Sequence, residues 1–243
     1  MSYDGDNWGE ASGTWIGNDA SHAYILAAAH TFDMPPAPDT YLVRAASGKI
    51  LKPDRAWSHP DWNGDTDTRT GWDLTILRIP GPLTDMGEAP WLYNGDDEHG
   101  RLITFVGFGS RGIGSVGQQD RFYEGSDKAA AQGMVDQWVG PEKRLKEDED
   151  GGNYLGIYLP HEDGSIENPY DGATKPTTPL VGLLGSGDSG GSAWLQIGAK
   201  WVIVAVNSNG DGNANYGDSS WFTRIQPHER WIRGIFPGAR FTS

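Results

Sequence analysis

Short apolar segments alternate with polar, glycine-rich turns along most of the chain. Segments of this length bounded by turn residues are typical of β-strands. The predicted strands cover residues 12–17, 24–29, 41–44, 71–79, 102–109, 154–159, 200–207 and 220–225. One stretch near the end has a helical pattern, because Pro227 suits a first turn and Trp231, Ile232 and Ile235 fall on one face. The pattern therefore predicts an all-β protein with a C-terminal helix.

Three polar stretches interrupt this pattern and are predicted to be loops. Residues 160–178 form a long loop, and loops of that length are often functional. Pro141–Gly152 is a run of charges typical of an exposed loop. The acidic stretch Asp61–Thr68 is interpreted as a solvated turn, with a Ca²⁺ site formed by its oxygen atoms as the alternative.

Composition and charge narrow the possible functions. The 243 residues include 35 Gly, 15 Pro and 11 Trp, which suits many turns and a core rich in aromatic side chains. The formal net charge of −14 argues against nucleic acid and membrane surfaces as partners. No apolar run approaches the ~18 residues of a membrane span. The chain has no cysteine, so disulfides, zinc–thiolate sites and cysteine nucleophiles are excluded, and we expect no metal and no cofactor.

The stretch Gly185–Trp194 carries the strongest chemical signal, because four glycines flank Asp188 and Ser189 in it. Glycine is favoured where the backbone takes a positive φ or where another group must approach closely. A serine on such a turn presents its hydroxyl while neighbouring N–H groups point to one spot, as a nucleophile does beside an oxyanion hole. A glycine-rich β-turn with an exposed serine is the alternative that this motif alone leaves open.

Two further motifs precede this stretch in the chain. Leu26–His30 is an apolar segment that ends in a histidine, and Asp73–Ile79 is an acid followed by an apolar segment. Together with Gly187–Gly191 they resemble, in the same order, the motifs of the trypsin/chymotrypsin-like serine proteases. The resemblance runs from about Ser12 to Phe236 and is weakest in residues 110–178.

This resemblance implies a fold of two six-stranded antiparallel β-barrels with the active site in the cleft between them. The first domain would comprise residues 1–106 and carry His30 and Asp73. The second would comprise residues 107–243 and carry Ser189 and the terminal helix. The absence of cysteine departs from the animal members and resembles bacterial-type ones.

The resemblance also identifies His30, Asp73 and Ser189 as a catalytic triad that hydrolyses peptide bonds through an acyl-enzyme. His30 would take the Ser189 proton and pass it to the leaving amine, because imidazole titrates near neutral pH. Asp73 would fix the tautomer of His30 and stabilise the imidazolium. The N–H groups of Gly187 and Ser189 would bind the developing oxyanion.

Asp188 raises the question of activation. In the family, this aspartate pairs with the ammonium of an apolar N-terminus freed by cleavage, and Met1–Asp4 does not resemble such a terminus. A buried carboxylate without a partner is costly. The sequence therefore leaves three possibilities: a pro-segment has been removed, another cation pairs with Asp188, or the loop is active without activation.

The substrate-binding pocket is assigned from the same resemblance. Its floor falls near Leu183, and an apolar floor favours an apolar or small substrate side chain. Its walls fall at Asn207, Ser208, Asn209 and Ser220. Two alternatives stay open: Leu183 belongs to the core, or Asp218 provides a preference for basic side chains.

Two other classes of function compete with a protease. An α/β-hydrolase esterase shares Gly-x-Ser-x-Gly, but its order of serine, acid and histidine would require His228, and alternating strands and helices are absent. A non-catalytic or zymogen-locked binding module on the protease fold is the second, and the complete triad argues against it. The leading prediction is a secreted or periplasmic, monomeric serine endopeptidase whose partner is a polypeptide substrate.

Overall fold

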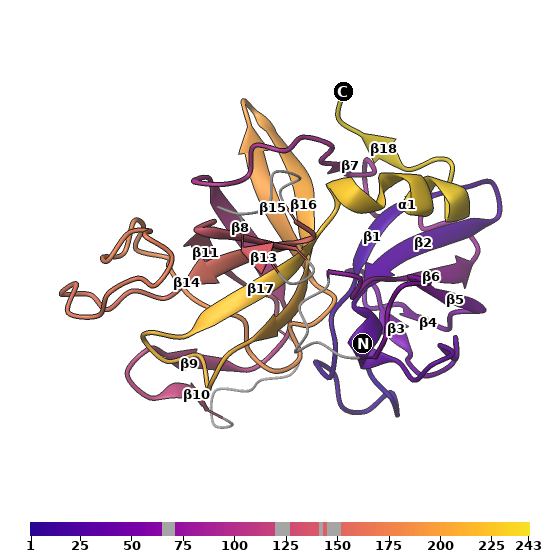
Figure 1. Cartoon of the computed structure of the whole chain (residues 1–243). Helices are drawn as coiled ribbons and strands as arrows, with labels where there is room; N and C mark the ends of the chain where they lie inside the picture. The colour runs from indigo at the N-terminus through magenta and orange to yellow at the C-terminus, as the bar shows by residue number, and fades with distance from the viewer. Residues whose placement is uncertain (65–70, 120–126, 141–142, 145–151) are drawn as a thin grey trace.

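The computed structural model describes residues 1–64, 71–119, 127–140, 143–144 and 152–243. The described residues form mostly β-strands, and they include one α-helix near the C-terminus (Figure 1). The predicted all-β class is therefore confirmed. No helix in these residues is long and apolar enough to cross a membrane. The acidic residues 65–68 and most of the charged run predicted as an exposed loop lie outside the described residues.

The N-terminal part of the chain forms a sheet in the order β1-β2-β6-β5. Its strands are β1 (Thr14–Asn18), β2 (His22–Ala27), β5 (Arg55–Ser58) and β6 (Thr75–Pro80), all paired antiparallel. β2 is buried on both faces because it is apolar throughout after its first residue. A separate hairpin joins β3 (Val43–Arg44) to β4 (Ile50–Leu51).

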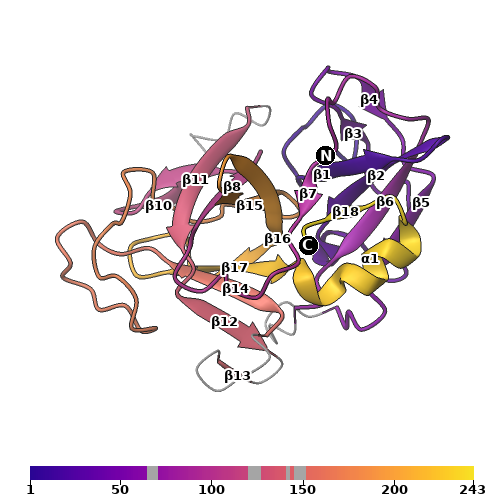
Figure 2. The same ribbon diagram turned by 90° about the horizontal axis from the view of Figure 1, so that it is seen from above.

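A larger sheet follows, in the order β11-β8-β15-β16-β17-β14-β12-β13, with β7 and β18 joined to it beside β16. Figure 2 shows that this sheet is strongly curled. Its strands are β7 (Trp91–Leu92), β8 (Leu102–Gly107), β11 (Ala129–Met134), β12 (Gln137–Gly140), β13 (Lys143–Arg144), β14 (Tyr154–Tyr158), β15 (Ser192–Ile197), β16 (Lys200–Gly210), β17 (Ser219–Arg224) and β18 (Arg240–Phe241). The predicted division of the chain between residues 106 and 107 falls inside β8.

Several strands lie where the apolar pattern is weak. They include β11 and the hairpin of β9 (Arg111–Ile113) and β10 (Gly117–Gln119), within the region where the sequence resemblance is weakest. Among the named strands β11 pairs with β8 alone, at the end of the large sheet, although Gln132 also forms a single bridge to Val181, and only Gly133 of its residues is buried. An edge strand of small and polar residues gives no alternating signal, so the pattern missed it. Residues 160–178 contain no helix or strand, as predicted.

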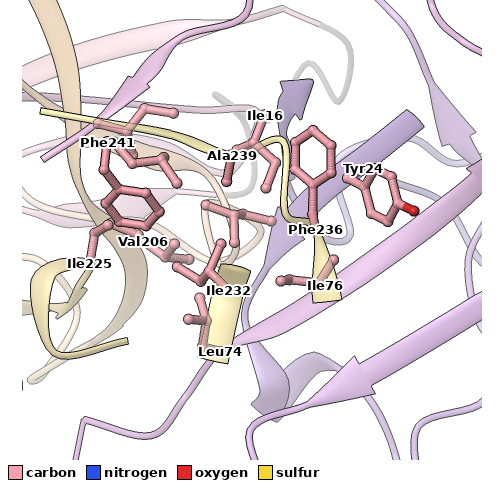
Figure 3. Packing of buried hydrophobic residues seen from close by; sticks show 13 residues of the cluster. Ile16, Tyr24, Leu74, Ile76, Val206, Ile225, Ile232, Phe236, Ala239 and Phe241 are labelled. Atoms are coloured by element: carbon pink, nitrogen blue, oxygen red, sulfur yellow. The ribbon is translucent and has the colours of Figure 1, made fainter. Parts of the chain in front are cut away.

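One hydrophobic cluster joins the two sheets and the terminal helix (Figure 3). Ile16 and Leu74 enter it from the N-terminal part of the chain, and Val206 enters it from β16. The helix α1 (Glu229–Ile235) follows a 3₁₀ turn that contains Pro227, and it buries Ile232 in the cluster. Because burial of apolar surface is the main stabilising term in folding, this shared core fixes the two sheets against each other.

Candidate active site

Antiparallel pairing of β2 with β6 brings His30 and Asp73 together. Ala27 pairs with Thr75, so the residues just after β2 and just before β6 lie at the same end of the sheet. His30 stands in a 3₁₀ turn, Ala29–Thr31, that follows β2. Its backbone N–H donates to Asp73 Oδ1 at 2.8 Å, which fixes the aspartate against the turn.

The side chains of His30, Asp73 and Ser189 form a continuous hydrogen-bonded chain. His30 Nδ1 lies 2.7 Å from Asp73 Oδ2, and His30 Nε2 lies 2.9 Å from Ser189 Oγ. Asp73 has no exposed surface, whereas about a quarter of the His30 side chain is exposed, at 26%. Because a carboxylate only accepts, Nδ1 carries the ring proton and the bare Nε2 accepts from the Ser189 hydroxyl. The order is that of a nucleophile, a base and a residue that orients the base.

A second set of hydrogen bonds holds the Asp73 carboxylate. Ser208 Oγ donates to Asp73 Oδ2 at 2.5 Å, and Tyr154 Oη lies 2.9 Å from Ser208 Oγ. Thr223 Oγ1 donates to the Asp73 carbonyl oxygen at 3.0 Å. Asp73 Oδ2 therefore accepts from two donors, which fix the orientation of the carboxylate toward His30. Ser208, predicted as a pocket wall, instead directs its hydroxyl at Asp73.

The environment of His30 changes the basicity of its imidazole. Burial lowers the pKa of His30, but the negative charge of Asp73 and the hydrogen bond to it more than offset this. The net pKa of His30 is raised above its usual value of 6.5. A base with a raised pKa accepts the serine proton more favourably.

The loop before β15 leaves two backbone donors available beside Ser189. Gly190 N and Gly191 N donate to Asn207 O and Asp188 O, both at 2.9 Å. Among the described residues, no acceptor faces the N–H groups of Gly187 and Ser189. These are the two donors that the sequence predicted for an oxyanion hole.

Gly187 is required by both its conformation and its neighbours. Its φ of +93° lies in a region that residues with a side chain rarely adopt. A Cβ atom built on Gly187 would stand 2.0 Å from the carbonyl oxygen of Gly9. The N-terminal segment therefore packs directly against this loop, and only glycine allows the approach.

Asp188 is held by backbone N–H groups. Its Oδ1 accepts from Gly109 N and its Oδ2 from Gly185 N, both at 2.8 Å. Burial raises the pKa of the Asp188 carboxyl, while the two N–H groups and the charge of Arg111 oppose the rise. Within the described part of the chain, Asp188 forms no ion pair. The carboxylate thus has hydrogen-bond donors that do not depend on a nearby ammonium.

Ser12 fixes the same loop from the N-terminal side. Its backbone N–H donates to Ser189 O at 2.8 Å, and its Oγ donates to Gly187 O at 2.9 Å. Its Oγ also accepts from Phe108 N at 3.1 Å. Ser12 is only 1% exposed, so its three hydrogen bonds form away from water. It holds the carbonyl groups of Gly187 and Ser189, and it thereby restrains the loop that carries the two unpaired N–H groups.

The residues predicted to form the substrate pocket do not share one described cavity. Leu183 is half-buried, packs on the core and lines a cavity of about 790 Å³ that Asp188 also lines. Asn207 Nδ2 donates to Val106 O and Asp188 O, at 3.0 and 3.1 Å. Ser220 Oγ accepts from Leu184 N at 3.0 Å. Of the predicted pocket residues, only Leu183 lines that cavity.

Three residues of this site carried no signal in the sequence. Ser12 and Tyr154 stand in segments predicted only as strands, and Gly109 is one of many glycines. Ser12 lies 175 residues from Gly187 in the chain, so no local spacing relates the two. The pairing of distant segments alone reveals their role.

Comparison with protein-family models and with curated proteins gave no match for this chain. Its function is therefore inferred from its residues and their geometry.

Proposed function

We propose that this protein is a serine endopeptidase of the trypsin/chymotrypsin-like type, with His30, Asp73 and Ser189 as its triad. The observation that carries the proposal is the hydrogen-bonded chain from Asp73 through His30 to Ser189, at 2.7 and 2.9 Å. Its chemistry suits hydrolysis of an acyl group, because a hydroxyl nucleophile and a base that can remove its proton are already in contact.

The proposed reaction has two halves. Ser189 Oγ attacks the substrate carbonyl carbon while His30 Nε2 takes its proton, and the N–H groups of Gly187 and Ser189 bind the oxyanion. His30 then gives the proton to the leaving amine, and an acyl-enzyme remains. Water, deprotonated by His30, attacks the ester, and the proton returns to Ser189 as the acid leaves.

We propose that the two sheets correspond to the two six-stranded β-barrels of this family. The antiparallel order β1-β2-β6-β5 and the curled large sheet support this assignment. The triad is divided between the two sheets as the assignment requires. His30 follows β2 and Asp73 precedes β6 of the N-terminal sheet. Ser189 precedes β15 of the large sheet.

We propose that the oxyanion loop is formed without pairing of Asp188 to an ammonium. This possibility is favoured over a removed pro-segment and over a different cation beside Asp188. Its support is the pair of backbone donors on Asp188 and the three hydrogen bonds of Ser12. A loop held in this way needs no cation to keep the N–H groups of Gly187 and Ser189 available to an oxyanion.

We propose a preference for apolar or small substrate side chains. Leu183 offers an apolar surface, and Asp218 is engaged by its own loop. Asp218 Oδ2 accepts from Asn213 N at 3.1 Å and from Asn215 N at 2.8 Å, which disfavours its use for a basic side chain. A polypeptide substrate, a monomeric state and a secreted or periplasmic location rest on the sequence resemblance.

The all-β fold argues against an α/β-hydrolase esterase. That function would need His228 as the base, and His228 is fully buried with its Nε2 2.8 Å from Gly71 O. Burial lowers the pKa of His228 to about 3, the value of a very weak base. The role of base therefore falls to His30.

Labelling with a fluorophosphonate is the direct test of the proposal. We expect one adduct per chain, mapped by mass spectrometry to Ser189, as Oγ bonds to phosphorus and fluoride leaves. The labelling rate should fall as the pH drops, because protonated His30 cannot take the serine proton. Since the pKa of His30 is raised, the half-maximal rate should come above pH 6.5. Absence of an adduct across this pH range would favour a non-catalytic binding module.

Replacement of Ser12 tests how the oxyanion loop is held. Ser12→Ala removes the hydroxyl bonded to Gly187 and Phe108 but keeps the backbone bond to Ser189. We expect kcat to fall about tenfold, since a misdirected oxyanion donor typically costs somewhat less than the 10²-fold of a deleted one. KM should change little, and steady-state peptide hydrolysis measures both constants.

The matched control for this experiment is Thr14→Ala. Its hydroxyl donates to Ser192 Oγ at 2.8 Å, two residues away from Ser12 and without contact to Gly187 or Ser189. An equal loss of kcat in both variants would show that Ser12 acts through general stability and not through the loop.

A further inference from the structure

A groove lies along the junction of the two sheets, apart from the triad. Its volume is about 1040 Å³, the upper end of the range for small-molecule sites. It is lined by residues of β1, β3, β7, β15, β16 and β18, and none of His30, Asp73 and Ser189 is among them. Ser12 and Gly191 do line it, so the groove adjoins the oxyanion loop, and a ligand could bind there whether or not the triad is catalytic.

Tryptophan side chains form much of its wall. Trp15, Trp91 and Trp194 each pack one side against the hydrophobic core, which holds them in place. Trp201 also lines the groove and is 47% exposed. Large aromatic faces that are already fixed favour binding of an apolar body, because little side-chain freedom is lost.

The charge of this groove is opposite to that of the chain. The whole sequence has 19 basic and 33 acidic residues, yet the groove is lined by four basic residues and one acidic residue. The acid, Glu88, is neutralised by Arg240 at 2.7 Å. Lys128 and Lys200 form no ion pair with a described acid, and Lys200 Nζ lies 5.6 Å from the centre of the Trp91 ring. An anion entering the groove thus meets unpaired positive charge.

We propose that this groove binds an amphipathic carboxylate, a single small molecule with an apolar body and one anionic head. The tryptophan walls would contact the apolar body. Lys200, whose ammonium lies near the Trp91 ring, would face the carboxylate, Lys128 would add positive charge elsewhere along the groove, and Arg240, already bonded to Glu88, would hold the Trp91 face in position. The size of the groove, its aromatic lining and its reversed charge together favour this class over a cationic or a purely polar ligand.

The probe is decanoate. Its binding to the full chain is measured by isothermal titration calorimetry at low ionic strength. We expect saturable binding with a Kd of about 10 μM, in the range of single-site ligands of modest size. Decylamine, which has the same apolar body and the opposite charge, should bind at least about tenfold more weakly because like charges repel. Equal binding of the two would overturn the proposal, because only the apolar body would then be recognised.

Paired charge reversals locate the site. Lys128→Glu combined with Lys200→Glu should weaken decanoate binding at least about tenfold. The matched control, Lys52→Glu combined with Lys175→Glu, changes the net charge equally at exposed positions outside the groove and should leave Kd unchanged. Equal losses in the two double variants would mean that decanoate senses only overall charge, which contradicts a site in this groove.

A third variant tests the apolar wall. Trp201→Ala removes an exposed ring, so the fold should be retained, and decanoate binding should weaken severalfold. Leu180→Ala, at an exposed position outside the groove, is its control. Failure of decanoate to bind, together with binding of a short acidic peptide that carries tryptophan, would assign the groove to a peptide instead.

Discussion

Ser189→Ala is expected to lower kcat for peptide hydrolysis about 10⁶-fold, the size seen when a nucleophilic serine is removed from a comparable triad. The variant loses the only atom that forms the acyl-enzyme, while the base and the oxyanion donors stay in place. Ser189 Oγ contacts His30 Nε2 and, more distantly, Ser208 O at 3.3 Å. Because its loss removes only these bonds, the thermal unfolding transition should stay close to that of the unaltered protein.

A second serine in the same loop provides the control. Ser186 is exposed, and its contacts in the described structure come from its backbone: its N–H donates to Gln118 and its carbonyl oxygen accepts from Ser110. Ser186→Ala should therefore keep full activity and full fluorophosphonate labelling. Residual hydrolysis by Ser189→Ala at more than a small fraction of the original rate would contradict the assignment of the nucleophile.

Asp73→Asn is expected to lower kcat about 10⁴-fold, the loss typical of a wrong histidine tautomer in a triad of this kind. The carboxylate now accepts from His30 Nδ1 and from Ser208 Oγ through the same oxygen, Oδ2. An amide nitrogen at this position would face the ring N–H of His30, so the tautomer with a bare Nδ1 would be favoured. The ring proton would then stand on Nε2, and Ser189 would have no base.

The pH dependence separates this effect from simple loss of fold. Without the negative charge of Asp73, the pKa of His30 loses the contributions that raise it, and burial then lowers it. Any remaining activity of Asp73→Asn should therefore persist to lower pH than that of the unaltered protein. Asp163→Asn, at an exposed loop position, is the control and should alter neither kcat nor its pH profile. An Asp73→Asn variant with near-normal kcat would contradict the triad.

Much of the fold class could be predicted from the sequence, whereas the edges of the sheets could not. β2 and β14 are apolar runs bounded by turns. Both faces of each strand are buried, so nearly every residue is apolar and the run is recognised in the sequence. Most residues of β11 and of the hairpin of β9 and β10 are only partly buried, and these strands carry no such pattern. Their position depends on pairing with distant strands, which no local signal encodes.

For the candidate site, the sequence provided the reacting groups but not their support. His30, Asp73 and Ser189 were found because each stands beside an apolar strand or within a glycine-rich loop. Ser208 was predicted only as part of a pocket wall, and the contact of its hydroxyl with Asp73 was not foreseen. The direction of a side chain on β16 depends on strand register, and a shift of one residue reverses it.

By itself, the sequence determined the all-β class, the position of the terminal helix and the residue types from which the candidate triad is built. These follow from local periodicity and from the chemistry of single side chains, which neighbouring residues are sufficient to specify. Only the tertiary structure decided that Ser12 holds the oxyanion loop, that backbone N–H groups hold Asp188, and that tryptophans and cations gather in one groove. Each of these joins segments far apart in the chain, and such contacts exist only once the two sheets have packed on their shared core.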